Sequence, residues 1–421
     1  MKNKTAKLIS KFNFKRLPGI LKIYLLIALL APVIANEKPL IINYNGNLHF
    51  PAFSSDPYFE IITKDGQKEK IRTETIDWKN LKSDFSIFAF IQWSPGQSDL
   101  ENGNYASPFS KQFFINDRGE KVVLPFFQRH HLGTTRSGED VLAGLIHGTR
   151  ISLWIGFASM FIAGFFGVII GGLAGYLGDY NLKTQRIFSV YFLLAVIPAY
   201  YYSFILPSDF VSTSFSLSIL TGIISLLLTI LLFFSIILWP LFLKIRFPGK
   251  NYFTESISIP VDFIIMRIIE IFLSLPRMVL ILTIAAISRP SISTLILIIG
   301  FTSWTDIARI TRAEVLKLRE VDFILAEKSI GTRIKDILFK HILPNISPVI
   351  ITVLIFGVAS AILLETGLSF LGVGLPAGTV TWGTLMFAAK ENFMAWWLVV
   401  FPGLAITVLL VTLNKYGKKL Y

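Results

Sequence analysis

The chain has 421 residues, of which 53% are hydrophobic and 14% aromatic, and its formal net charge at pH 7 is +13. Its many uninterrupted apolar runs exclude a soluble domain of this size, and the basic residues lie beside those runs, which favours a membrane protein over a nucleic-acid-binding protein. The chain has no cysteine, so disulfides, thiolate metal sites and cysteine nucleophiles are excluded.

Residues 1–36 predict a cytoplasmic N-terminus followed by a first membrane helix. Seven Lys or Arg and no acid lie between Met1 and Lys22, at the start of an apolar run from Leu17 to Ile34. By the positive-inside rule, such a basic flank lies in the cytoplasm. The apolar core and the small residue Ala35 also fit a cleaved signal peptide, so this remains the alternative to the uncleaved anchor that we expect.

Residues 37–149 predict a segment outside the cytoplasm. Their 12 Lys or Arg and 14 Asp or Glu nearly cancel, as in an exported domain. Alternating apolar and polar stretches, separated by Asp-Gly, Pro-Gly and Arg-Gly turns, predict short strands. We expect a small β-containing cap on the outer membrane face, and an unfolded spacer is the alternative.

The end of this outer segment carries a recognisable motif, LGTTRSGEDVLAGLIHGTRISL. It resembles the motif before the second membrane helix of the oligopeptide and dipeptide branch of the ABC importer permeases. The matching positions are Leu132, Gly133, Thr134, Gly138, Asp140, Val141, Leu142, Gly148, Arg150 and Ser152. Thr135, Glu139 and His147 depart from the pattern. The earlier stretch IANEKPLIINYNGNLHFP is similar to a subgroup associated with oligopeptide and microcin C uptake.

The chemistry of this region disfavours two other interpretations. Gly133 and Gly138 have the spacing of a phosphate-binding loop, but Glu139 and Asp140 stand where a lysine and a hydroxyl are required, and carboxylates repel phosphate. The adjacent histidines 130 and 131 could bind a metal, yet the spaced further ligands of a metal site are missing from the pattern. We expect neither a nucleotide nor a metal here.

Residues 150–179 predict the second membrane helix. Gly167, Gly171 and Gly175 recur every four residues, which places them on one helix face and lets another helix approach closely. The alternative is that glycine is simply common in membrane helices.

Residues 180–260 interrupt the family pattern, which otherwise continues directly from Gly178 to Val261. Apolar runs at Ile187–Leu206 and Leu217–Leu243 predict two inserted membrane helices, for which we expect a lipid-facing position at the periphery. The first inserted run weakly echoes the sequence after Val261, so it is the alternative candidate for the core helix.

Residues 261–421 predict the rest of the permease core. Further apolar runs lie at Phe263–Ile287, Ile292–Ile307, Ile346–Leu364 and Trp396–Leu413. The even total of eight spans places both termini in the cytoplasm, although Arg289 and Lys390 fall on the outer side. We therefore predict an all-α polytopic protein of a bacterial inner membrane, with six core helices, two inserted helices and a small extracytoplasmic β-containing segment.

Residues 309–344 are a charged segment between two of these apolar spans. Apolar residues recur at helical spacing, Gly331 interrupts them and Pro344 closes the segment, which predicts two short helices around a glycine turn. The segment resembles the cytoplasmic coupling loop of ABC importer permeases, although His341 replaces an isoleucine and the leading glutamate of the pattern is absent. By this resemblance, the loop docks in a groove of a separate ATPase subunit. The residues implied are Phe323, Leu325, Ala326, Glu327, Lys328, Gly331, Ile342, Leu343 and Pro344. We expect Phe323 and Ile324 to enter the groove, ringed by Arg319, Lys328 and Arg333.

Charged residues inside the apolar spans are candidates for the translocation path or its gate. Arg267 and Glu270 are one helical turn apart, so mutual pairing is the alternative to substrate contact. Glu365 lies at the outer end of its span, where it could serve as an outer gate or an interface residue.

The resemblance implies a permease subunit of an ATP-driven importer for oligopeptides or dipeptides. Its implied partners are a second homologous permease, two cytoplasmic ATPase subunits that carry ATP-Mg, an extracytoplasmic substrate-binding protein and membrane lipid. We expect the chain itself to bind no cofactor, no metal and no nucleic acid, and to catalyse no reaction. Import of nickel or another small solute, and ATP-independent transport, are the alternatives. An intramembrane hydrolase is disfavoured because HExxH and GxSxG patterns are absent.

Overall fold

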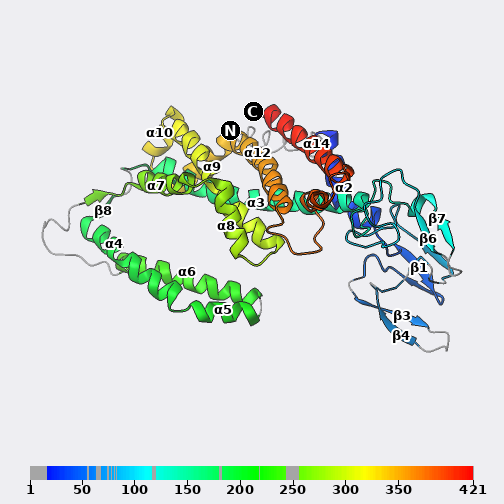
Figure 1. Ribbon diagram of the computed structural model, residues 1–421. Helices are drawn as coiled ribbons and strands as arrows, with labels where there is room; N and C mark the ends of the chain where they lie inside the picture. The colour runs from blue at the N-terminus through cyan, green and yellow to red at the C-terminus, as the bar shows by residue number, and fades with distance from the viewer. Residues whose placement is uncertain are drawn as a thin grey trace. The chain divides into compact units, whose positions relative to one another are not determined.

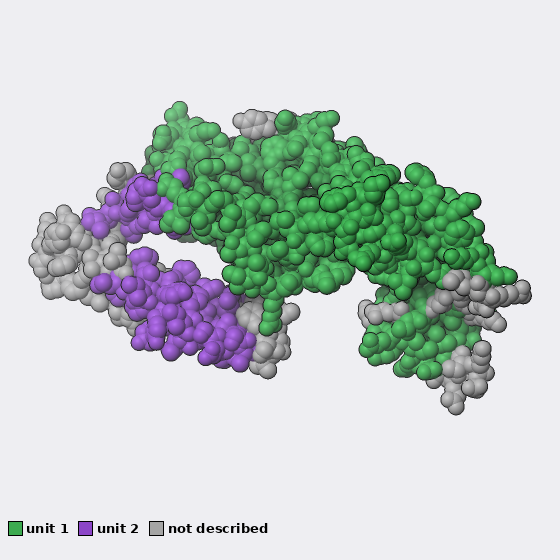
Figure 2. Space-filling model, viewed as in Figure 1, with its two compact units in different colours: residues 1–172, 269–421 green, residues 173–268 purple. Residues whose placement is uncertain are grey.

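The computed structural model describes most of the chain as two compact units. The described residues are 17–420 without 55, 63–67, 74, 77, 80, 82, 116–119, 180–182, 218 and 243–255. One unit contains Met1–Gly172 and Ile269–Tyr421, and the other contains Leu173–Ile268 (Figure 2). The basic N-terminal flank predicted to be cytoplasmic, residues 1–16, lies outside the described residues.

Long helices form the centre of the larger unit. They are α2 (Gly19–Ile34), α3 (Val141–Leu177), α8 (Arg277–Ile287), α9 (Ile292–Arg319), α12 (Leu343–Phe370) and α14 (Trp397–Leu420), joined by the short α13 (Trp382–Ala388) and the 3₁₀ turn η6 (Ala389–Glu391). Helix α12 packs against α9, α13 and α14, and α14 packs against α2 (Figure 1). Buried Ile155, Ile299, Ile362 and Leu409 belong to the apolar core between these helices.

Helices lie at every apolar run that the sequence predicts to cross the membrane, as far as those runs are described. Those long and apolar enough to cross are Val141–Leu177, Leu194–Ser214, Ile292–Arg319, Ile334–Phe370 and Trp397–Lys419. The bent pair Val261–Ser274 and Arg277–Ile287 raises these five to six if it is one span, and shorter apolar helices lie at Gly19–Ile34 and Ile224–Ile237. The predicted helical, polytopic fold is confirmed.

Two of the helices extend beyond the apolar spans that the sequence predicts. Helix α3 already begins at Val141, and α9 continues to Arg319 instead of ending at Ile307. At about 1.5 Å per residue, α3 is longer than the roughly 30 Å of a hydrocarbon core. Hydropathy marks only the apolar part of such a helix, because backbone hydrogen bonds continue into its polar ends.

The span predicted at Phe263–Ile287 is not one straight helix. Helix α7 (Val261–Ser274) and α8 meet at an angle of 79°. Pro276 is the residue before α8, and a proline within a helix lacks the N–H for the backbone hydrogen bond and clashes with the preceding turn. The break therefore follows from a residue that the apolar pattern conceals.

Glycines let α3 approach α9 closely. A Cβ atom on Gly167 would lie 2.7 Å from the Cβ of Ile307 and 2.8 Å from the carbonyl oxygen of Trp304. A Cβ on Gly171 would overlap the backbone of Ala308. The predicted close packing at these two glycines is confirmed.

Short strands form the outer segment. Strand β1 (Ile41–Tyr44) pairs antiparallel with β2 (Asn47–His49), where Ile42 lies opposite His49, and with β5 (Phe85–Ile87) on its other edge. Two further antiparallel pairs are β3 (Tyr58–Ile62) with β4 (Lys68–Arg72), and β6 (Phe113–Ile115) with β7 (Lys121–Val123); the 3₁₀ turn η2 (Phe126–Gln128) follows. A small buried cluster with Ile42, Phe59 and Trp78 holds the first strands together. The segment is thus a folded β-containing cap rather than a spacer.

The smaller unit contains the insertion. Helix α4 (Arg186–Tyr200) continues through the π-turn η3 (Tyr201–Ile205) to α5 (Ser208–Leu217), and both helices pack against α6 (Ile219–Phe242). Strand β8 (Lys183–Gln185) pairs with β9 (Ser256–Ser258). This pairing closes the insertion at its base, where the N–H of Phe263 donates to the Asp179 carboxylate at 3.0 Å.

Candidate functional site

The charged loop between α9 and α12 contains the predicted helix–glycine–helix arrangement. Helix α10 (Asp322–Ser329) precedes Gly331, and α11 (Ile334–Asp336) runs through the π-turn η5 (Ile337–Ile342) into α12. Gly331 has φ +78°, a left-handed conformation that only glycine adopts without strain. The sequence pattern predicts that the second helix ends at Pro344, but the helix continues into α12. Pro344 lies in the first turn of α12, where its missing N–H costs nothing.

Three isoleucines attach this loop to its own chain. Ile324, Ile337 and Ile342 are 1%, 0% and 0% exposed, and α10 packs against both α9 and η5. The expectation that Ile324 enters a partner's groove was therefore wrong. Ile342, assigned to the docking residues by resemblance, also packs inside this chain and supports the loop from within.

The outward face of the loop combines apolar and basic side chains. Leu325, Ile330, Ile334 and Phe339 are 45%, 79%, 45% and 58% exposed, and Ala326, Lys328 and Arg333 are exposed beside them. Phe323 is half-buried, as are Leu343 and Pro344. Sequence reasoning missed Ile330, Ile334 and Phe339 as candidate contacts, although Ile330 stands directly before the glycine turn. Exposed apolar residues that are rimmed by charges are typical of an interaction surface.

Glu327 connects the two halves of the loop across Gly331. Its carboxylate accepts a hydrogen bond of 2.7 Å from the Thr332 hydroxyl, and its other oxygen lies 3.7 Å from Nε2 of His341. His341 and Glu327, which both depart from the family pattern, thus lie beside each other. Glu327 positions the loop as well as contributing to its surface.

The outer motif surrounds a buried histidine between two carboxylates. His130 is fully buried, with Nδ1 2.9 Å from Oδ2 of Asp140 and Nε2 3.2 Å from Oδ2 of Asp99. Oδ1 of Asp140 accepts the N–H of Ala143 at 2.6 Å, in the first turn of α3. Both ring nitrogens thus contact carboxylates, so His130 links Asp99 of the outer segment to Asp140, the residue before α3.

Charges and hydrogen bonds shift the pKa values of His130 and Asp99. Burial by itself lowers the pKa of His130, but hydrogen bonds to Asp140 and Asp99, and their charges, outweigh burial and raise that pKa above its ordinary value. Burial also opposes ionisation of Asp99, yet hydrogen bonds from His130 and Asn102 leave its pKa below the ordinary value. Both shifts favour an imidazolium beside an ionised Asp99.

The remaining residues of the outer motif join the cap to α3, α13 and α14. Gly133 and Gly138 have φ values of 83° and 84°. The Thr134 hydroxyl donates to the carbonyl of Asn102 at 2.9 Å, and the Thr134 carbonyl accepts the Trp397 indole N–H at 3.1 Å.

Two further motif residues lie within α3. Gly148 lies against α13, because a Cβ there would be 3.1 Å from Cδ1 of Trp382. Arg150 is exposed.

Glu365 lies in the interior of the larger unit. Its carboxylate is 0% exposed and accepts hydrogen bonds from Ser152 of α3 at 2.9 Å and from Ser369 of α12 at 2.8 Å. Buried charges in membrane helices are retained where such partners satisfy them. In this conformation Glu365 joins two helices and does not line an open path, which favours its interpretation as an interface residue over that as a gate.

Arg267 and Glu270 are exposed on α7, and the guanidinium of Arg267 lies 4.9 Å from the ring centre of Phe263. Their role in a pathway stays a prediction. Sequence reasoning missed another intramembrane pair, in which Arg277 of α8 contacts Asp306 of α9 at 3.3 Å. The signal was available, because Asp306 interrupts an apolar run.

The sequence of the chain is similar to those of known transport proteins. Residues 253–416 match the family described as binding-protein-dependent transport system inner membrane component. The chain is 25% identical over 393 residues to the inner membrane ABC transporter permease protein YejE of Escherichia coli, covering 93% of this chain and 87% of the relative.

Two further relatives carry names that refer to peptides. The dipeptide transport system permease protein DppC of Bacillus subtilis is 26% identical over 317 residues, which is 75% of this chain and 73% of the relative. A putative peptide permease protein of Brucella ovis is 36% identical over 161 residues, 37% of this chain, and the match spans about half of that relative, 53%.

Proposed function

We propose that the chain, whose residues 253–416 match the family of binding-protein-dependent transport system inner membrane components, imports short peptides. The chain is a permease subunit of an ABC importer, a multi-pass component of the inner membrane. A permease catalyses no reaction itself. It supplies membrane helices that change position and a surface on which a partner subunit docks to move them.

The outward face of the α10–α11 loop carries this proposal. Leu325, Ile330 and Ile334 are apolar and exposed, while Ile324 and Ile342 anchor the loop to α9 and η5 from within. A loop held in this way can transmit a push from a docked subunit to α9 and α12. The proposed docking partner is a cytoplasmic ATPase subunit, and the ATP-Mg that drives transport binds to that partner.

The complete importer proposed here has five chains. They are this permease, a second homologous permease, two ATPase subunits and an extracytoplasmic substrate-binding protein. Both termini of this chain are proposed to lie in the cytoplasm. The peptide class of substrate is supported by the names of the dipeptide permease and the putative peptide permease to which the chain is similar.

A charge substitution on the docking face tests the proposal. In the complete complex reconstituted in proteoliposomes, Ile330→Glu should abolish co-purification of the ATPase and most of the ATP-dependent uptake of labelled tripeptide. Ile330 is 79% exposed, so the folded chain tolerates the charge.

A matched control is Phe109→Glu, which places the same charge on a 90% exposed apolar residue of the outer segment and should retain the ATPase. Undiminished ATP-driven uptake by Ile330→Glu would refute the docking surface. Uptake of a nickel chelate without any uptake of peptide would refute the substrate class.

A further inference from the structure

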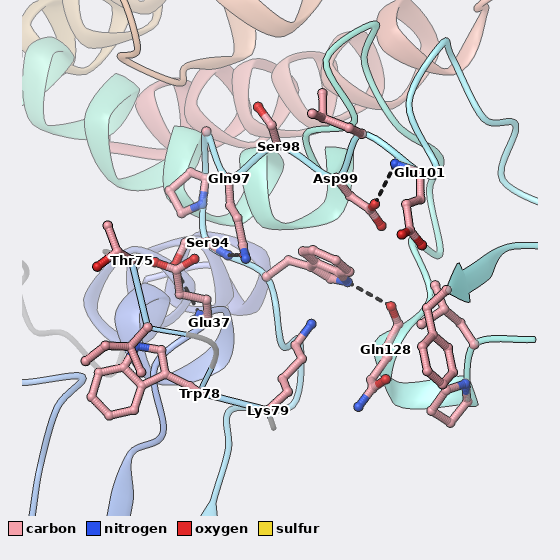
Figure 3. A pocket seen from close by; sticks show the side chains of 18 residues that line it. Glu37, Thr75, Trp78, Lys79, Ser94, Gln97, Ser98, Asp99, Glu101 and Gln128 are labelled. Atoms are coloured by element: carbon pink, nitrogen blue, oxygen red, sulfur yellow. Dashed lines mark hydrogen bonds between the residues drawn. The ribbon is translucent and has the colours of Figure 1, made fainter. Parts of the chain in front are cut away.

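The outer segment contains a cavity of about 1130 Å³ that the permease mechanism described above does not use (Figure 3). Its lining includes two buried tryptophans, Trp78 and Trp93, together with the loop from Ser94 to Glu101. Cavities that hold small organic ligands have volumes of roughly 300–1000 Å³. This one can hold a ligand of several linked residues.

The aromatic wall of the cavity is held rigidly. The Trp93 indole N–H donates to the carbonyl of Gln128 at 2.9 Å, and the ring stacks on His130 at 4.2 Å between ring centres. Nζ of Lys79 lies 3.7 Å from the centre of the Trp93 ring. A ligand side chain would therefore meet a preformed surface, which lowers the entropy lost on binding.

The charged groups of the lining are mostly acidic. Three carboxylates, those of Glu37, Asp99 and Glu101, stand against the one lysine, Lys79. Asp99 and Glu101 are adjacent in Figure 3, and the N–H of Glu101 donates to Oδ1 of Asp99 at 3.1 Å. A concave surface with an excess of one charge raises the local concentration of the opposite charge. The cavity is thus suited to a cation, although the whole chain has a net charge of +13.

We propose that this cavity binds the N-terminal part of a short peptide, with the peptide's ammonium group at Asp99 and Glu101. The apolar side chains of the peptide would lie against Trp78 and Trp93. This inference rests on the proposed function, because it takes the peptide to be the transported substrate. It goes beyond that function in placing a substrate contact on the permease itself, outside the membrane helices.

The same contacts connect the cavity to α3. Oδ2 of Asp99 contacts Nε2 of His130 and also accepts a hydrogen bond of 2.8 Å from Asn102. His130 in turn contacts Asp140, whose other oxygen accepts the N–H of Ala143 in α3. A cation bound at Asp99 competes with His130 for one carboxylate, so occupancy of the cavity alters a contact at the start of α3.

Peptide binding to the purified full chain in lipid nanodiscs tests the proposal. By calorimetry, trialanine should bind, and N-acetylated trialanine, which lacks the ammonium charge, should bind at least about tenfold more weakly. Glu101→Gln should weaken trialanine binding by about the same factor. Its matched control is Glu60→Gln, which removes a carboxylate that pairs with Lys70 across β3 and β4, and which should bind as the wild type does.

Three outcomes would overturn the cavity proposal. The first is equal affinity of the chain for trialanine and its acetylated form. The second is an unchanged affinity for trialanine in Glu101→Gln. The third is that the purified chain binds no free peptide, while the substrate-binding protein does.

A parallel measurement of ATP-driven uptake by the complete complex tests the cavity proposal separately from the proposed function, which is the import of peptides. Peptide uptake that is unaltered by Glu101→Gln, alongside unaltered binding, rejects the cavity while the importer function stands. Failure of the wild-type complex to import any peptide rejects the function itself.

Discussion

His130 is the residue on which the junction between the cap and α3 depends. It is fully buried and contacts carboxylates that come from the loop between β5 and β6 and from the residue before α3. Removing one member of a buried ion cluster leaves the others without compensation, which costs roughly 3–5 kcal/mol. The contact between His130 and Asp99 is therefore strongest while the imidazole is protonated and the Asp99 carboxylate is ionised.

A pH dependence of stability follows from the two shifted pKa values. The folded-state pKa of His130 is raised from 6.5, so its contribution is complete below about pH 6.5 and is lost as the pH rises through the folded value. The folded-state pKa of Asp99 is lowered from 3.8, so its contribution is complete above that pH and is lost as the pH falls through the folded value. The melting temperature, followed by tryptophan fluorescence, should be highest between these limits and fall on either side.

Variants of the two adjacent histidines separate this effect from general titration. His130→Gln should lower the melting temperature and remove its fall on the alkaline side. His131→Gln removes a ring that lies 4.7 Å from that of Phe126 and should keep the wild-type profile. An alkaline fall that persists in His130→Gln would contradict the assignment.

Gly331 sets the conformation of the docking loop. Its φ of +78° costs a residue with a Cβ about 1–2 kcal/mol, even though the space around the added atom is open. Gly331→Val should therefore reduce ATP-dependent uptake while the amount of folded chain in the membrane stays unchanged. Gly403→Ala, in α14, where an added Cβ also meets nothing within 4 Å, should leave uptake at the wild-type level. Equal uptake by both variants would show that the turn is not required.

At the scale of elements, the contact of α3 with α9 depends on the absence of side chains. In Gly171→Ala the new methyl group would overlap the backbone of Ala308, and overpacking of this kind costs typically 1–3 kcal/mol. The melting temperature of the purified protein should fall accordingly. Gly172→Ala provides the adjacent control, because its added Cβ meets nothing within 4 Å and should leave the melting temperature unchanged. Similar melting of both variants would mean that the two helices can separate without cost.

The bend between α7 and α8 is a second feature of this scale. Pro276 stands at the break, and Arg277, the first residue of α8, contacts Asp306 of α9. Charged groups within apolar helices persist where they are paired or face water. Pro276 therefore breaks the helix between α7 and α8, and the ion pair of Arg277 with Asp306 holds α8 against α9.

At the scale of the whole molecule, the insertion is separable from the core. It begins and ends at one place, because β8 pairs with β9 and the N–H of Phe263 donates to Asp179. Removing residues 180–260 eliminates two predicted membrane helices together and so preserves the sidedness of everything that follows. The deleted chain should still retain the ATPase on purification and import peptide.

The control for this prediction is a deletion that removes only one of the two inserted membrane helices. Removing residues 186–217 takes out α4 and α5 and leaves α6, so the docking loop would be placed on the opposite side of the membrane. That chain should lose the ATPase. Loss of ATPase binding by both deletions would show that the insertion itself is needed.

Local features of the chain were enough to predict its helices, the short strands of residues 37–149 and the helix–glycine–helix arrangement between α9 and α12. Apolar runs locate helices because a membrane demands about 20 apolar residues in succession, and a glycine turn announces itself because only glycine relaxes at positive φ. Both are properties of residues close together in the sequence. They do not depend on which distant segments meet.

Side-chain orientation and ion pairing required the tertiary structure. Ile324 and Ile342 carry the same apolar signal as Ile330, yet they are buried while Ile330 faces outward, because α9 and η5 cover only one side of the loop. Glu365 meets Ser152 across 213 residues of sequence, and His130 meets Asp99 across 31. Burial and electrostatic partners arise from contacts between remote segments, and a periodic pattern within one segment contains no information about them.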